Sequence, residues 1–164
     1  MSPKDLEYVA SRFQSATVLV GTLVAPAADF SSIEDIRVAC LEDWFTNYRL
    51  LAEFLICAQK GGPTPQMFAP GWSAEGKPWR NRLGKEYHFA SVHVAHLWGP
   101  EGEAEEPFNP ATPAKQVADM KARAEFLLDV IVDFVDAVRP RDGSHAEVMR
   151  DGIALARRAL ARLG

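Results

Sequence analysis

The sequence predicts an all-α protein, built as a single antiparallel bundle of four to five helices. Apolar residues recur at spacings of three and four in five separate segments, whereas no segment alternates apolar and polar residues as a half-buried strand would. The length of 164 residues is enough for one domain with a full-sized core, while two domains would each be small. We therefore expect one helical domain over residues 1–164, with its core in residues 31–138.

The first helix is expected over residues 3–25. Ser2 followed by Pro3 is a good pair for an N-cap and a first helical position, and apolar residues then follow at helical spacing. Pro26 should end this helix, because proline interrupts the hydrogen bonding of a helix interior.

The second helix is expected from residue 31 to about residue 59. Ser31 and Glu34 have the spacing of a capping box at its start. The apolar arc that follows is broad, which is typical of a helix that packs against several neighbours. This helix and the next one should therefore lie at the centre of the bundle.

Glycine and proline recur throughout residues 61–77, so this segment should be a long loop. We expect its own aromatic residues Phe68 and Trp72 to order it. The third helix should begin near Pro78 and end before Gly99, because apolar residues again recur at helical spacing between them.

The last third of the chain predicts an acidic loop and two more helices. Residues 99–113 are rich in glutamate and proline, and an apolar helix over residues 114–138 follows them. Ser144 and Glu147 then have capping-box spacing and should open a final helix that extends to residue 163.

Four acidic residues form a stripe on the fourth predicted helix, namely Glu125, Asp129, Asp133 and Asp136. Such a row of carboxylates could bind a metal ion or could simply form a face of the helix that is exposed to solvent. Helical di-metal bundles add a Glu-x-x-His motif, which does not accompany this row. We therefore expect a solvated acidic face, with no metal and no cofactor.

The composition bears on the partners and the location of the protein. The formal net charge is −4, which lacks the basic excess typical of proteins that depend on phosphate contacts. The longest apolar run, residues 16–28, is too short and interrupted to cross a membrane. Cys40 and Cys57 fall on one predicted helix, too far apart for a disulfide. Together with an N-terminus that does not look like a secretory signal, these features predict a cytoplasmic protein.

One track of the third predicted helix gathers most of the candidate chemistry. Arg82, Glu86, Phe89, His93 and His96 follow one another at spacings of four, three, four and three. The first two can form an ion pair, and the two histidines can share a partner. The histidines could bind a metal, act in acid and base catalysis beside an arginine, or be ordinary structural residues.

Arg49 is the second candidate, on the margin of the apolar arc of the second predicted helix. An ion pair with Glu53, one turn away, is the ordinary interpretation of such a residue. In the functional interpretation, Arg49 presents its guanidinium to a buried carboxylate, a histidine of the next helix or a ligand phosphate.

Two short stretches resemble a known group of proteins. They are Asn47-Tyr48-Arg49-Leu50-Leu51-Ala52-Glu53-Phe54-Leu55 and Val94-Ala95-His96-Leu97, with the aromatic and proline loop of residues 67–72 between them. They resemble small uncharacterised bacterial helical proteins related to the HEPN superfamily, over roughly residues 31–138. The family's histidine is replaced here by Asn47, and its asparagine by Leu50.

The resemblance implies a HEPN-like bundle that acts as a non-catalytic binding or regulatory module linked to nucleic acid, with Arg49, Glu86 and His93 as binding residues. Arg49 and His96 are expected to form a polar site between helices. The alternative is a metal-independent endoribonuclease of the toxin or defence type, which would use Arg82 with His88 or His96 as catalytic residues. The partners expected are a second copy in a homodimer and RNA, but no membrane.

Overall fold

The computed structural model describes residues 2–29, 34–56, 62–96 and 113–163. Over these residues the protein is helical without strands, as predicted. The helices are α1 (Pro3–Thr22), α2 (Val24–Ala27), α3 (Glu34–Ile56), the 3₁₀ turn η1 (Pro65–Met67), α4 (Arg80–His96), α5 (Pro113–Val138) and α6 (Gly143–Ala161). The predicted segments therefore correspond to long helices in the structure.

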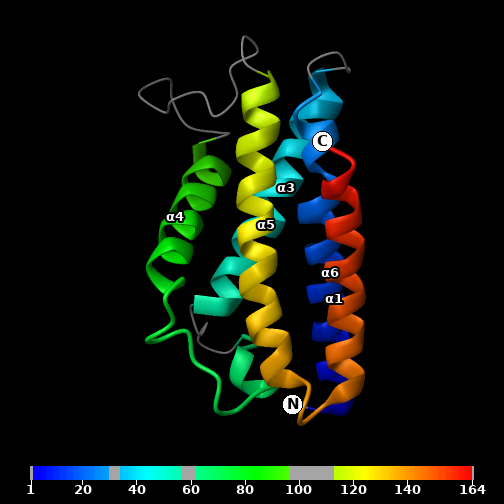
Figure 1. Ribbon diagram of the computed structural model, residues 1–164, viewed down its shortest axis with the longest axis vertical. Coiled ribbons are helices and arrows are strands. Elements are labelled where there is room, and N and C mark those ends of the chain that lie inside the picture. The colour runs from blue at the N-terminus through cyan, green and yellow to red at the C-terminus, as the bar shows by residue number, and fades with distance from the viewer. Residues whose placement is uncertain (1, 30–33, 57–61, 97–112, 164) are drawn as a thin grey trace.

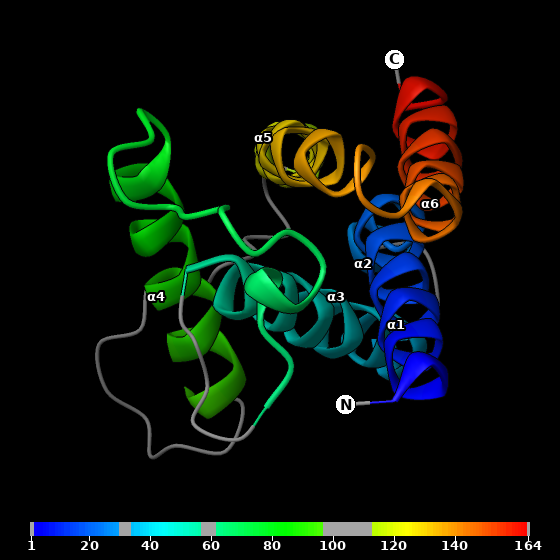
Figure 2. The ribbon, with the colours of Figure 1, turned by 90° about the horizontal axis from the view of Figure 1, so that it is seen from below.

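The long helices form an up-and-down bundle. Each of α3, α4, α5 and α6 runs opposite to the long helix before it, as expected for an antiparallel bundle (Figure 1). With five long helices in this order, the first and the last point in the same direction. The helices α1 and α6 lie side by side in both views and pack in parallel (Figures 1 and 2).

The crossing of α1 and α6 depends on a glycine. A Cβ atom at Gly21 would lie 2.5 Å from the Cα atom of Ala156. Real Cβ atoms do not approach that closely, so the two backbones pack at a distance that only glycine permits.

Helix α1 begins with the cap that the sequence predicts, but it ends earlier. The Ser2 hydroxyl accepts a hydrogen bond from the Asp5 backbone N–H at 3.3 Å, and the Asp5 carboxylate accepts one from the Ser2 N–H at 2.6 Å. Hydrogen bonds from the backbone and side chain of Ser2 lower the pKa of Asp5. At the other end, Pro26 lies in the first turn of the short helix α2. The backbone N–H groups of a first turn have no partner within the helix, so the missing N–H of proline costs no hydrogen bond there.

The cap of α6 differs from the prediction, because Asp142 and not Ser144 is the N-cap residue. The Asp142 carboxylate accepts hydrogen bonds from the His145 backbone N–H at 3.2 Å and from the Ser144 hydroxyl at 2.8 Å. Burial raises the pKa of Asp142, but these hydrogen bonds and the His145 ring outweigh it and lower the pKa overall. The predicted capping box at Ser31 lies outside the described residues.

Helix α3 is the centre of the bundle, as its broad apolar arc predicts. It packs against α1, α2, α4 and α5. Trp44, Phe45 and Tyr48 are its fully buried aromatic side chains, and the Trp44 indole N–H donates to the carbonyl oxygen of Val20 at 2.9 Å.

The prediction that the next helix, α4, is also central is wrong. Helix α4 lies at the edge of the bundle with α3 as its main neighbour (Figure 2). The reason is a narrow buried stripe: over residues 80–92 only Leu83, Glu86 and Ala90 are buried.

The loop between α3 and α4 is ordered by its aromatic side chains, as expected. Phe68 and Trp72 are both buried, and each packs edge-on against Phe134 of α5. Phe13 and Phe54 complete this aromatic cluster. Among the described helices, none has the length and apolar character needed to cross a membrane.

Candidate functional site

The predicted track on α4 faces α5, so its described members take part in one interhelical site. The guanidinium carbon of Arg82 lies 3.8 Å from the ring centroid of Phe126 on α5. Glu86 forms an ion pair with Arg123 of α5, and Phe89 packs against the same arginine. The expected Arg82 to Glu86 pair is thus replaced by contacts of both residues with α5.

The pair of Glu86 and Arg123 is the main link between α4 and α5. Arg123 donates a hydrogen bond to the Glu86 carboxylate, and its guanidinium carbon lies 3.8 Å from the ring centroid of Phe89. The side chain of Glu86 is only 11% exposed and that of Arg123 is 30% exposed. A carboxylate so far removed from water requires its counter-ion, so the pair fixes the two helices relative to each other.

Tyr48 brings α3 into the same site. Its hydroxyl donates to the backbone carbonyl oxygen of Arg123 at 3.4 Å, which is long for a hydrogen bond, and lies beside the Glu86 carboxylate. Burial raises the pKa of Tyr48 well above its ordinary value of 10.0, and the negative charge of Glu86 adds to this shift although Arg123 and Arg82 oppose it. Tyr48 therefore stays protonated and can only share its proton within the site.

We call Tyr48, Glu86 and Arg123 the interhelical cluster. It connects three helices and closes its own charges, with one carboxylate facing one guanidinium. Such an arrangement suits structural locking of the three helices.

The outward face of α4 has a different character. Lys85 and His88 are exposed on it and Arg82 is exposed at its border with α5, whereas Glu86, the single acidic residue of this helix, is turned inward to Arg123. An inward carboxylate leaves the outward side with cations, on a chain whose formal net charge is −4. This concentration of charge is local and differs in sign from the protein as a whole.

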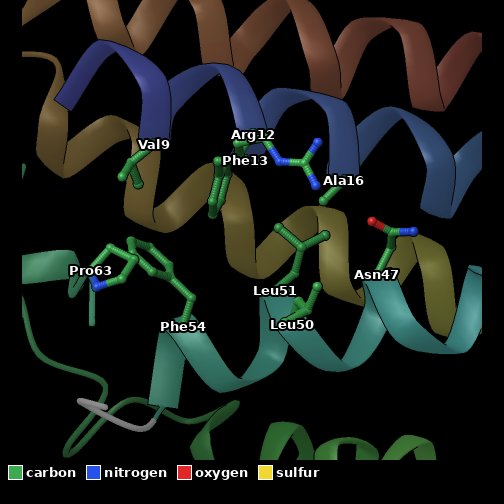
Figure 3. Close-up of a pocket in the computed structure, with 9 residues that line it drawn as sticks. All are labelled: Val9, Arg12, Phe13, Ala16, Asn47, Leu50, Leu51, Phe54 and Pro63. Carbon is green, nitrogen blue, oxygen red and sulfur yellow. The ribbon is translucent and has the colours of Figure 1, made fainter. Parts of the chain in front are cut away.

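Arg49 forms the ordinary pair with Glu53 that its position suggested. Its Nη2 atom lies 3.9 Å from the Glu53 Oε2 atom. Asn47 and Leu50, which replace the polar residues of the similar family, lie instead on the side of α3 that faces α1 (Figure 3). They do not belong to the interhelical cluster.

The side chains of His93 and His96 lie outside the described residues, so their expected roles stay predictions. The register of α4 nevertheless bears on the proposed pair of Arg49 and His96. Phe89 meets Phe45 of α3, with ring centroids 5.7 Å apart. In antiparallel helices with a rise of 1.5 Å per residue, positions 49 and 96 are then about 16 Å apart along the axis. This register weighs against a shared layer.

The residues of the ribonuclease alternative are not brought together in the described structure. Arg82 is turned against Phe126, while His88 is exposed and stands about 120° away from Arg82 around the helix. The third candidate, His96, cannot be placed at the side-chain level.

Three of the four carboxylates in the acidic stripe of α5 form ion pairs. Asp129 pairs with Arg157 at 2.8 Å, and Asp136 with Arg150 at 2.5 Å, both on α6. Asp133 pairs with Lys77, which lies in the loop before α4; its Oδ1 atom is 2.8 Å from the Lys77 Nζ atom. Within the described ranges, no group of three or more histidine, cysteine or acidic side chains is arranged to hold a metal ion.

Sequence reasoning missed two members of the cluster, Tyr48 and Arg123. Residues seven positions apart lie on the same face of a helix. Gln116 and Val130, seven residues before and after Arg123, are both buried, so Arg123 lies on the buried face of its helix. That position is a signal that a partner carboxylate must lie opposite. The signal cannot say which carboxylate, because the pairing of α4 with α5 is tertiary.

The fold and the site define a helical-bundle protein with a closed polar cluster between three helices and a cationic outer face on α4. Comparison of the chain with protein-family models, with curated proteins and with solved structures finds no match.

Proposed function

We propose that the protein is a non-catalytic, HEPN-like binding module that holds RNA on the outward face of α4. The observation that supports this function is the charge of the helix. Helix α4 contains three arginine or lysine residues and one acidic residue, and that acid is paired with Arg123 in the interhelical cluster. The exposed cations remain available for phosphate groups.

Aromatic rings beside these cations support RNA as the ligand. Arg82 and Arg123 each lie over a phenylalanine ring, Phe126 and Phe89. Proteins that bind single-stranded nucleic acid combine positive grooves with aromatic or guanidinium planes on which bases stack. The exposed Arg82 is therefore suited to phosphate contact and to stacking, whereas Arg123 stays paired with Glu86.

The resemblance to HEPN-related proteins is part of the proposal, because it links this type of bundle to nucleic acid. The non-catalytic form is preferred over the ribonuclease alternative, because His88 stands about 120° away from Arg82 around α4, so the two side chains do not face one reacting phosphate.

The test is binding of a fluorescent single-stranded RNA, followed by anisotropy over a range of salt concentrations. Arg82→Gln combined with Lys85→Gln removes two cations from the face of α4. The control combines Arg158→Gln with Arg162→Gln, which removes the same charge from exposed positions at the end of α6, on the other side of the bundle (Figure 2).

We expect the α4 variant to weaken binding and to reduce the slope of log K against log salt by about 1.4, since each phosphate contact on a single strand contributes about 0.7. The control should bind like the wild type. Equal loss in both double variants, or no loss in the α4 variant, would contradict the proposal.

The same RNA, run on a denaturing gel after incubation with excess chelator, tests the enzyme alternative. We expect the RNA to stay intact. If the wild type cleaves the RNA and His88→Ala does not, the ribonuclease function is correct and the proposal of a non-catalytic binding module is wrong.

A further inference from the structure

A second candidate site lies between α1 and α3. The side chains there enclose a hollow of about 190 Å³ that opens to solvent, drawn in Figure 3 with the residues that line it. An engineered apolar cavity of about 150 Å³ is large enough to bind benzene, so this hollow has room for one aromatic ring and a small substituent. It does not include any residue of the interhelical cluster.

The floor of the hollow is apolar and firmly packed. Phe13 and Phe54 meet edge to face, with ring centroids 5.4 Å apart, and both pack against Phe134 behind them. Leu51 is buried beside them, and Leu50 is 47% exposed at the rim. Because the aromatic floor is held by the core, the hollow is formed before any ligand arrives.

One end of the hollow is polar. Figure 3 shows Arg12 of α1 and Asn47 of α3 toward the same end, with Phe54 and Pro63 toward the other. The Asn47 amide nitrogen is held by Asp43, which accepts from it through its backbone oxygen at 2.7 Å and its Oδ1 at 2.9 Å.

Among the described residues, Arg12 has no comparable partner. It is exposed, and no ion pair joins it to any acidic side chain in the described part of the chain. Its guanidinium offers several N–H donors to a planar anion beside an apolar hollow.

We propose that this hollow binds a small aromatic monocarboxylate, with the ring on the floor of Phe13 and Phe54 and the carboxylate on Arg12. The ring size follows from the volume, its apolar contacts from the floor, and the anionic group from the cation at the polar end. The site is separate from the face of α4 and does not depend on RNA binding.

The experiment is a titration of the labelled protein with benzoate, observed through the methyl resonances of Leu50 and Leu51. Benzyl alcohol serves as the uncharged ring and acetate as the anion without a ring. Arg12→Met keeps the apolar stem of this exposed residue and removes its charge. Arg158→Met, at an exposed position on α6, is the matched control.

We expect benzoate to saturate the Leu50 and Leu51 shifts at roughly millimolar concentration, as for a ligand of few atoms. Arg12→Met should weaken benzoate about tenfold or more, since a hydrogen bond to a charged group is lost, and should leave benzyl alcohol unchanged. Arg158→Met should bind benzoate like the wild type.

Three results would overturn the proposal. One is the absence of saturable shifts at Leu50 and Leu51. Another is equal benzoate affinity in the wild type and Arg12→Met. The third is acetate binding as tightly as benzoate, which would mean that the ring contributes nothing.

Discussion

At the scale of single residues, the described structure depends on how a few buried polar groups are paired. Tyr48, Glu86 and Arg123 come from three different helices and satisfy one another. The opposite side of α3 carries Asn47 and Leu50, so one helix separates the interhelical cluster from the apolar hollow. The polar residues of α3 therefore belong to two separate sites: Tyr48 to the interhelical cluster and Asn47 to the hollow.

The raised pKa of Tyr48 leads us to expect that the protein loses stability at alkaline pH. Because its pKa in the folded protein is raised above 10.0, the unfolded chain releases the phenolic proton first as the pH rises. The stabilisation is therefore complete below pH 10 and is lost as the pH climbs toward the folded value. Urea unfolding at pH about 8 and about 11 should show a lower free energy of unfolding at the higher pH.

Tyr48→Phe isolates this contribution. At neutral pH we expect it to cost about 1 kcal/mol, the typical net value of one hydrogen bond. In alkali it should reduce the pH dependence, whereas Tyr8→Phe, at a residue that is 67% exposed, should leave that dependence as in the wild type. An unchanged alkaline loss in Tyr48→Phe would show that another group causes it.

Part of the candidate site could be predicted at this scale. The helical wheel placed Arg82, Glu86 and Phe89 on one track, and in the structure all three contact side chains of α5. The partner of Glu86 could not be predicted, because local spacing favours Arg82 while the approach of α5 supplies Arg123. The pair of Arg49 and Glu53 was predictable because it is local.

At the scale of elements, the helices follow from spacing and caps. Apolar periodicity located the long helices, and the cap at Ser2 was predicted correctly. The start of α6 was placed two residues late, because Ser144 and Glu147 have the spacing of a capping box, whereas it is the Asp142 side chain that accepts the hydrogen bond from the His145 backbone N–H. Helix ends depend on such competing local hydrogen bonds, which the sequence presents together.

The contact between α1 and α6 predicts opposite effects for two glycine substitutions. In Gly21→Ala the new Cβ would lie 2.5 Å from Cα and 2.7 Å from the carbonyl oxygen of Ala156, so the helices must separate. We expect a loss of about 1–3 kcal/mol in the free energy of unfolding.

Gly84→Ala is the matched control within α4. The nearest atom to its new Cβ would be the flexible Arg80 Nη1 at 3.4 Å, so the gain in helix propensity of up to about 1 kcal/mol should prevail. Urea unfolding of both variants measures the difference. A Gly21→Ala protein as stable as the wild type would contradict the close crossing of α1 and α6.

At the scale of the whole molecule, the described structure is an up-and-down bundle whose first and last helices meet in parallel (Figure 1). The all-helical class was predictable from periodicity alone. The edge position of α4 was not, because its apolar stripe looked similar to that of a central helix until burial was known. The expected homodimer stays a prediction that light scattering would measure.

Charge is distributed unevenly over this bundle. Three carboxylates of the acidic stripe of α5, Asp129, Asp133 and Asp136, are paired with cations from α6 and from the loop before α4. The exposed cations Arg82 and Lys85 of α4 are not part of those pairs. A protein with a formal net charge of −4 can in this way present a cationic face to one partner.

The most direct test of the proposed RNA-binding face is an NMR titration with a short single-stranded RNA at low salt. Backbone amide shifts should change most over residues 80–92 of α4, and these changes should disappear as salt is raised. Changes centred on α6, or no changes at low salt, would contradict the assignment of RNA binding to α4.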